Sequence, residues 1–189
     1  MTTPRTSAAT AREDATTARA LEAAGSVPDP EIPVVTLADL GIVRGALIEN
    51  GRLVVELTPT YSGCPATDVI RNDVIVALRQ AGFADADVRL VLAPPWTTDW
   101  ISEEGRRKLR DYGIAPPARH AAASIVRFVR TGGGGVDRCR DRTGDTDEPQ
   151  CPRCASPQVE LLSRYGSTPC KSLYRCRSCL EPFDHFKPH

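Results

Sequence analysis

Cys151-Pro-Arg-Cys154 and Cys176-Arg-Ser-Cys179 are two C-x-x-C pairs near the end of the chain, and they decide how its last part folds. About twenty residues separate the pairs, a spacing typical of the two halves of a tetrahedral metal site. Each pair can form a tight turn that directs two thiolates toward one point. A segment this short has too little apolar material for a core of its own, so a bound metal would hold it together. We therefore predict that residues 151–189 form a zinc ribbon.

The segment between the pairs predicts two short strands, at 159–165 and 171–175, and Phe183 and Phe186 are expected to cover the metal site. Zinc is the favoured metal, although iron in a rubredoxin-like site uses the same four thiolates. Free or disulfide-bonded cysteines are the alternative to a shared site. Cys170 lies outside both pairs, and we interpret it as a buried, unligated thiol in preference to an additional ligand.

Composition narrows the classes of protein that fit this chain. Lys+Arg and Asp+Glu number 24 each in 189 residues, so no net charge attracts it to nucleic acid or membrane. No apolar run is long enough to cross a bilayer, and the N-terminus lacks the apolar core of a signal peptide. Paired cysteines without an export signal predict a cytoplasmic protein whose thiols bind metal. Cys139, isolated between arginines, is expected to be a bystander.

The chain before the ribbon predicts a small α/β (α+β) domain at residues 11–117, preceded by a polar, disordered stretch at 1–10. Apolar periodicity and turn signals give the order helix–β–β–helix–β–helix. The expected elements are a helix at 11–24, a hairpin at 41–49 and 52–58 around Asn50-Gly51, a helix from Pro65 to about Ala81, a strand at 88–93 and a helix at 102–113. The glycine-rich and charged stretch at 118–150 predicts a flexible linker.

Cys64 is the first candidate functional residue of this domain. Pro65 suits the first position of a helix, which makes Cys64 the expected N-cap. There the free N–H groups and the positive end of the helix dipole favour the thiolate, which binds metals or attacks electrophiles. A small capping residue, or a thiol buried against the sheet, is the alternative.

Two loops carry side chains that a ligand or partner would contact. Three prolines within Val27–Pro33 exclude regular structure, so this loop either presents the carboxylates of Asp29 and Glu31 or is only a stiff connector. Trp96 and Trp100 either form an aromatic edge for a partner or, as we favour, plug the end of the sheet.

Several motifs resemble known families. Asp29-Pro-Glu31-Ile-Pro33, Asp39-Leu-Gly41-Ile-Val43 and Thr58-Pro-Thr60…Gly63-Cys64-Pro65 resemble the signature of the iron–sulfur assembly domain that includes bacterial SufT. Longer runs resemble the PaaD family, the auxiliary subunits of the multicomponent phenylacetyl-CoA epoxidase system. These runs are 92–102, 105–109, 112–117 and the stretch from Tyr165 to Phe183. The resemblance covers about residues 15–117 and 151–187, whereas 118–150 is longer and richer in glycine than the family pattern.

The resemblance implies a role in aerobic phenylacetate breakdown, in which a di-iron oxygenase works with a reductase that carries flavin and a 2Fe–2S cluster. PaaD-like subunits mature such metal centres and do not perform the epoxidation. Cys64 corresponds to the family's cysteine, and Asp29 and Glu31 correspond to its acidic loop. These residues are therefore expected to hold iron or an iron–sulfur cluster transiently, with the oxygenase subunits and the reductase as partners.

The residues themselves agree with a non-catalytic protein. His120, His185 and His189 lie in no E-x-x-H motif of a di-iron centre, and the chain has neither a G-x-G-x-x-G motif nor a P-loop. A thiol-dependent enzyme built on Cys64 would lack a nearby histidine base. The ribbon could instead bind nucleic acid, but its basic residues outnumber its acidic residues only modestly. A structural subunit that bridges partners, and a homodimer with Cys64 at a symmetric interface, both remain open.

Overall fold

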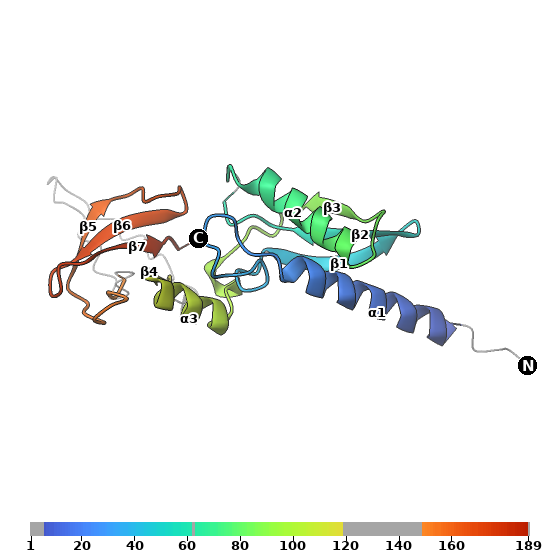
Figure 1. Ribbon diagram of the computed structural model, residues 1–189, viewed down its shortest axis with the longest axis horizontal. Helices are drawn as coiled ribbons and strands as arrows, with labels where there is room; N and C mark the ends of the chain where they lie inside the picture. Colours follow the sequence, from blue (N-terminus) through green and yellow to red (C-terminus); the bar gives the residue numbers. More distant parts are fainter. Residues whose placement is uncertain (1–5, 62, 119–148, 189) are drawn as a thin grey trace, which may run out of the picture.

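The structure, a computed structural model, describes residues 6–61, 63–118 and 149–188, with side chains from residue 11 onward (Figure 1). The first part of the chain forms α1 (Thr6–Gly25), β1 (Val43–Glu49), β2 (Arg52–Leu57), α2 (Thr67–Gln80), β3 (Asp87–Leu90), the 3-10 turn η1 (Thr98–Trp100), α3 (Glu103–Tyr112) and β4 (Ile114–Ala115). The last part forms β5 (Val159–Ser163), β6 (Lys171–Cys176) and β7 (Pro182–Phe186). The predicted α/β fold class is confirmed. Cys139, His120, His189 and nearly all of the predicted linker lie outside the described residues.

The first sheet has the order β1-β2-β3, with β1 antiparallel and β3 parallel to β2. Asn50 and Gly51 join β1 to β2 with φ of 51° and 77°, as a two-residue hairpin turn requires. The expected hairpin is confirmed. Helix α1 contacts β1, β2 and α2, and α2 contacts β3. None of the helices in the described residues is long and apolar enough to cross a membrane.

Two helix starts differ from the sequence-based expectation. Helix α1 begins at Thr6, within the stretch 1–10 that was expected to be disordered, because alanine-rich sequence has high helix propensity. Helix α2 begins at Thr67, two residues later than the predicted Pro65, and its N-cap is Ala66. The second difference removes Cys64 from the end of the helix.

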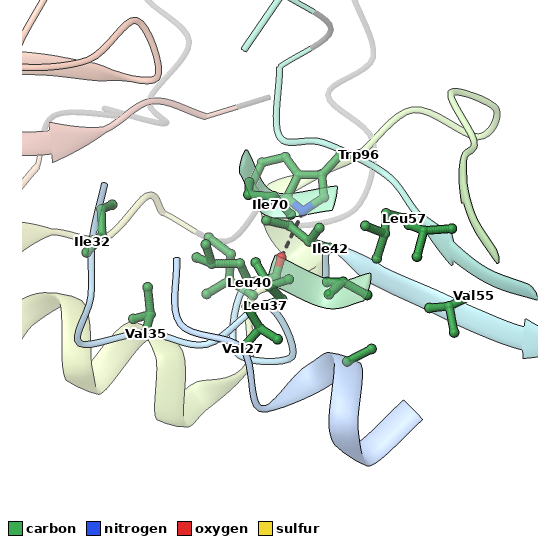
Figure 2. Packing of buried hydrophobic residues seen from close by; sticks show 14 of the residues in the cluster. Val27, Ile32, Val35, Leu37, Leu40, Ile42, Val55, Leu57, Ile70 and Trp96 are labelled. Carbon is green, nitrogen blue, oxygen red and sulfur yellow. Dashed lines mark hydrogen bonds between the residues drawn. The ribbon is translucent and has the colours of Figure 1, made fainter. Parts of the chain in front are cut away.

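The main core lies between the first sheet, the helices and the loops that follow α1 (Figure 2). Its members include Leu37, Ile42, Val55 and Ile70, all nearly inaccessible to solvent. The indole of Trp96 is buried against them and donates a hydrogen bond to the Leu40 carbonyl at 2.8 Å, drawn as the dashed line in Figure 2. Trp96 is therefore a plug, as predicted.

The second sheet has the order β4-β7-β6-β5 and joins the two parts of the chain. β5, β6 and β7 pair antiparallel, while β4, which directly follows α3, pairs parallel with β7. A strand from the first part of the chain thus forms an edge of the ribbon sheet, a pairing that the sequence did not indicate. In Figure 1 the β5–β7 ribbon lies at one end of the molecule, and α1 extends toward the other.

The two phenylalanines of β7 pack in different places. Phe183 packs with Cys151 and Cys176, as expected for a residue that covers the four-cysteine site. Phe186 belongs instead to the main core, where its ring lies near that of Trp96. Residues three apart on a strand point to opposite faces, so one strand cannot direct both rings at the cysteines. The expectation that Phe186 covers the metal site is wrong.

Candidate functional site

The four ribbon cysteines converge, as their spacing predicted. The Sγ atoms of Cys151, Cys154, Cys176 and Cys179 all lie within 4.8 Å of one another. Cys151 Sγ lies 3.6 Å from Cys179 Sγ, and Cys154 Sγ lies 3.5 Å from Cys176 Sγ. A tetrahedral zinc with Zn–S bonds near 2.3 Å places its sulfurs about 3.8 Å apart. The donor set and its spacing therefore fit a closed four-thiolate metal site.

The two C-x-x-C turns share the same backbone geometry. The N–H of Cys151 donates to the Ser156 carbonyl, and the N–H of Cys176 donates to the Glu181 carbonyl, five residues on in each case, at 3.0 and 2.9 Å. The residue after each pair, Ala155 or Leu180, has a positive φ, of 57° and 64° respectively. This repeated turn shapes each pair, and the pairing of β5 with β6 brings the two pairs together.

Backbone donors already stabilise one of these sulfurs as an anion. The N–H groups of Cys179 and Ser178 point at Cys176 Sγ, at 3.4 and 3.3 Å, and together with the neighbouring thiols of Cys154 and Cys179 they lower the pKa of Cys176 to about 6. Sulfur contacts help to raise the pKa values of Cys154 and Cys179. Hydrogen bonds from N–H groups to a thiolate favour the form that binds metal. Cys176 is therefore the thiol of this group that the backbone best stabilises as an anion.

Cys64 lies in the turn before α2 and not at its N-cap. The N–H and hydroxyl groups of Thr67 both donate to the Cys64 carbonyl, at 3.2 and 2.8 Å, so the helix starts after this turn. Burial raises the pKa of the Cys64 thiol, and the carboxylates of Glu31 and Asp29 raise it further against donors from Ala66 and Thr67. The prediction that Cys64 caps the helix as a ready thiolate is wrong, because desolvation and negative neighbours outweigh the local N–H groups.

Asp29 shapes the loop that carries it. Its carboxylate is 8 % exposed and accepts the N–H groups of Glu31 and Ile32 at 2.9 and 2.8 Å. Burial raises the pKa of Asp29, although these two hydrogen bonds and the Lys171 ammonium oppose the rise. Burial and Asp29 together raise the pKa of Glu31, again against Lys171. The Asp29 carboxylate thus stabilises the loop itself, and its charge also acts on that of Glu31.

The fold gathers the residues that the sequence singled out in the first domain. Asp29 and Glu31 both interact electrostatically with Cys64, although more than thirty residues separate the loop from the cysteine. Sequence reasoning missed Lys171, a buried ribbon residue whose charge acts on both carboxylates. The only signal of Lys171 was its place in the ribbon run that resembles the PaaD family, which gives no link to the acidic loop. The neighbouring Cys170 is buried, as the sequence predicted, but it lies in the main core.

A mixed α/β domain that presents an acidic loop beside a thiol, joined to a four-cysteine ribbon, defines a metal-handling protein of two modules. Residues 17–90 match the family described as "Iron-sulfur cluster assembly protein", and residues 136–187 match the "PaaD zinc beta ribbon domain". The chain is 45% identical over 161 residues to a "Putative 1,2-phenylacetyl-CoA epoxidase" subunit of Escherichia coli, covering 85% of this chain and 86% of that protein. It therefore belongs to the PaaD family of phenylacetyl-CoA epoxidase subunits, as its motifs indicated.

Other relatives match the first domain alone. "Fe-S protein maturation auxiliary factor YitW" of Bacillus subtilis is 34% identical over 92 residues, 48% of this chain and 89% of that protein. A similarly named factor of Porphyromonas gingivalis is 35% identical over 86 residues, 44% of this chain and 81% of that protein. A crystal structure of a domain of unknown function from Bacillus anthracis covers 53% of this chain and 96% of that chain, with 26% identity and a TM-score of 0.49.

Proposed function

We propose that this protein is a non-catalytic maturation factor of a phenylacetyl-CoA epoxidase system in aerobic phenylacetate degradation. In this role it delivers iron or an iron–sulfur cluster to the oxygenase or to its flavin and 2Fe–2S reductase. Membership of the PaaD family supports the epoxidase context. The relatives named as Fe-S maturation factors, which share the first domain, support the auxiliary role.

The observation that supports the proposal is that Asp29 and Glu31 lie near enough to Cys64 for their charges to raise the pKa of its thiol. A thiol and two carboxylates are ligands that iron accepts, and cluster iron prefers thiolates. The raised pKa of Cys64 does not oppose this role, because a bound metal deprotonates a coordinating thiol outright. The thiol then stays protonated until cargo arrives, and it loses its proton to solvent when the metal binds.

The two sites of the molecule suit different tasks. The ribbon supplies four thiolates to one point, a closed set typical of structural zinc. The Cys64 site would offer a single thiolate, so that a receiving protein could supply the remaining ligands. We therefore assign a structural Zn²⁺ to Cys151, Cys154, Cys176 and Cys179, and the transient cargo to Cys64, Asp29 and Glu31. Free thiols of this kind belong in the reducing cytoplasm, where we place the protein.

Metal analysis of partner proteins tests this function. The oxygenase and the reductase would each be produced with wild-type protein, with Cys64→Ala, or with Tyr61→Phe as a control on the same loop, where the tyrosine is 46% exposed. We expect Cys64→Ala to retain its zinc while at least one partner becomes poor in iron, and Tyr61→Phe to resemble wild type. Full metallation of both partners with Cys64→Ala would overturn the proposal. If the epoxidase complex then required this protein only for its assembly, the protein would be a structural bridge between subunits and not a delivery factor.

Anaerobic purification provides a second, direct readout. Iron and acid-labile sulfide present in wild type but missing from Cys64→Ala, with equal zinc in both, would place a stable cargo at Cys64. Zinc alone in both proteins would exclude stable binding of iron or a cluster. The metal analysis of the partner proteins would then decide between transient delivery and structural bridging.

A further inference from the structure

A cavity of about 660 Å³, the junction cavity, opens where the ribbon meets the first domain. The ribbon lines it with the loop Tyr165–Ser167 and with side chains of β6 and β7, among them Lys171 and Asp184. The first domain lines it with Glu31 of the acidic loop and with Tyr112 at the end of α3. This volume lies within the range of ligand pockets, which form preferentially where domains meet. No cysteine of the described residues lines the cavity, so it is separate from the thiols discussed above.

Hydrogen bonds hold the ribbon wall of the junction cavity in place. The Ser167 hydroxyl donates to Asp184 Oδ2 at 3.0 Å, and the N–H of Gly166 donates to the Lys171 carbonyl at 2.8 Å. A Cβ at Gly166 would lie 2.6 Å from Asp184 Oδ1, so the loop packs too closely for a larger residue. Tyr165, next to this glycine, is therefore presented by an anchored loop, which lowers the entropy cost of binding through its ring.

The junction cavity carries more negative than positive charge. The Lys171 side chain is 5% exposed, and its ammonium lies 3.7 Å from Asp184 Oδ2. Glu31 supplies a second carboxylate to the same cavity, and among the described residues it forms no salt bridge. Burial and the neighbouring Asp29 raise the pKa of Glu31, against the opposing charge of Lys171. Because a partly buried carboxylate is stabilised by a charge of opposite sign, the cavity favours a cationic ligand.

Two exposed tyrosine rings flank the junction cavity. Tyr112 and Tyr165 are 57% and 72% exposed, and no other large hydrophobic side chain of the described residues is as exposed as Tyr165. The Lys187 ammonium lies 4.6 Å from the centre of the Tyr165 ring. Lys187 lines a neighbouring cavity that also includes Tyr165, but it does not line the junction cavity, so its contact leaves the other side of the ring to a ligand. Tyrosines in such positions are typical of protein-binding surfaces.

An arginine side chain matches these groups better than a lysine does. Its planar guanidinium stacks on aromatic rings and donates paired hydrogen bonds to a carboxylate. The lysine ammonium is instead a compact and strongly hydrated point charge. Arginine and tyrosine also supply much of the binding energy of protein interfaces. The rings are largely exposed, so the arginine would come from the surface of another protein.

We propose that the junction cavity is the docking pocket for an arginine side chain of the protein that receives the cargo, the oxygenase or the reductase. The guanidinium packs against the rings of Tyr112 and Tyr165 and pairs with the Glu31 carboxylate. This inference rests on the proposed function and deepens it, because it names the surface that recognises the receiving protein. Glu31 also belongs to the loop assigned to the cargo, so the docked protein would lie beside the place of transfer.

Calorimetric titration of the oxygenase and of the reductase tests this surface. Full-length, zinc-loaded protein without iron is used, so that docking is measured apart from delivery. The variants are Tyr112→Ala, Tyr165→Ala and Glu31→Gln, with zinc content as the check on the ribbon. The control, Leu162→Ala, removes a 50% exposed ribbon side chain outside the cavity. We expect each of the three variants to weaken binding of at least one partner roughly tenfold or more, as loss of an interface hot spot does, and Leu162→Ala to bind like wild type.

Chemical labelling identifies the side chain that occupies the pocket. Phenylglyoxal modifies accessible arginines, and mass spectrometry of peptides from the receiving protein locates them. We expect one arginine of that protein to be shielded in the wild-type complex and to be labelled in the presence of Tyr165→Ala. Modification of its arginines beforehand should abolish docking, whereas acetylation of its lysines should not. Shielding of a lysine in place of an arginine would overturn the inference.

The outcomes separate the docking pocket from the proposed function. Wild-type affinity in all three variants, or no binding of either partner by the wild-type chain, would overturn the pocket, while the metal content of partners made with Cys64→Ala would still decide delivery. Docking that depends on the tyrosines, with partner metallation independent of Cys64, would keep the pocket and overturn delivery. Self-association that Tyr165→Ala abolishes, without binding of either partner, would overturn the inference in favour of a second copy of this chain.

Discussion

The ring of Phe186, in the last strand of the ribbon, lies 5.9 Å from the ring of Trp96 in the first domain, with 48° between their planes. Both side chains are almost fully buried, at 1 % and 5 % exposure. The indole of Trp96 is in turn tied to the Leu40 carbonyl. The ribbon and the first domain thus share one core.

Phe186→Ala should therefore destabilise the whole molecule and not the ribbon alone. Removal of a buried phenylalanine ring typically lowers the free energy of unfolding by about 3–5 kcal/mol. Urea denaturation followed by tryptophan fluorescence would measure it, since Trp96 reports on the contact. Leu180→Ala is the control, because that side chain is 59% exposed in the same ribbon. Equal stability of the two variants would contradict a shared core.

Gly41 and Gly51 form a matched pair for testing a close backbone approach. Both have positive φ, at 67° and 77°, but a Cβ at Gly41 would lie 2.6 Å from the Trp100 carbonyl oxygen, whereas nothing lies within 4 Å of one at Gly51. Gly51→Ala should lower the free energy of unfolding by about 1–2 kcal/mol, from backbone strain alone. Gly41→Ala should lower it by about 2–5 kcal/mol, because overpacking adds to the strain. Thermal unfolding of both variants measures the difference, and similar losses would mean that the Trp100 contact yields easily.

The Asp39–Lys108 pair predicts an acid-sensitive link between α3 and the loop after α1. Lys108 Nζ lies 2.7 Å from Asp39 Oδ2, and the two side chains are 30% and 10% exposed. Burial acts to raise the pKa of Asp39, but hydrogen bonds from Lys108 and Thr36 outweigh it and leave the pKa below its ordinary value. A carboxyl whose pKa falls on folding contributes stability above its unfolded pKa, near 4, and loses it as pH drops through the folded pKa.

Asp39→Asn should accordingly lower the free energy of unfolding by about 1–3 kcal/mol at pH 7, the usual contribution of a hydrogen bond to a charged group. The gap to wild type should shrink as pH falls below about 4. Urea denaturation from pH 7 to pH 3 measures it. Asp111→Asn, which removes an exposed partner of Arg107, should change stability by less than about 0.5 kcal/mol throughout. A gap that stays constant with pH would exclude the charge of Asp39 as its source.

Metal removal should unfold the ribbon before the first sheet. The four-cysteine turns close on one point, and metal binding is folding free energy for a segment this small. Chelation, or Cys176→Ser, should abolish hydrogen-exchange protection in β5 and in the β6 residues that pair with it, while β1–β3, whose core includes Phe186, keep most of theirs. Cys139→Ser with bound zinc is the control. Unchanged protection in a chain shown to contain no metal would mean that packing alone holds the ribbon.

The sequence by itself determined the features that depend on neighbours along the chain. Asn50-Gly51 requires a tight hairpin wherever it lies, because both residues tolerate positive φ. Each C-x-x-C turn closes through its own backbone hydrogen bonds, so the convergence of the four thiols could be predicted from spacing. The long motifs around these elements also identified the family.

Only the tertiary structure decided the chemistry of Cys64 and the way the modules join. Local N–H groups favour a thiolate there, yet burial and the carboxylates of Glu31 and Asp29 raise the thiol pKa, and both effects depend on segments distant in sequence. The pairing of β4 with β7 and the place of Cys170 in the main core are likewise contacts between distant segments. Spacing along a chain determines local backbone geometry, whereas desolvation and long-range charge exist only once the chain has packed.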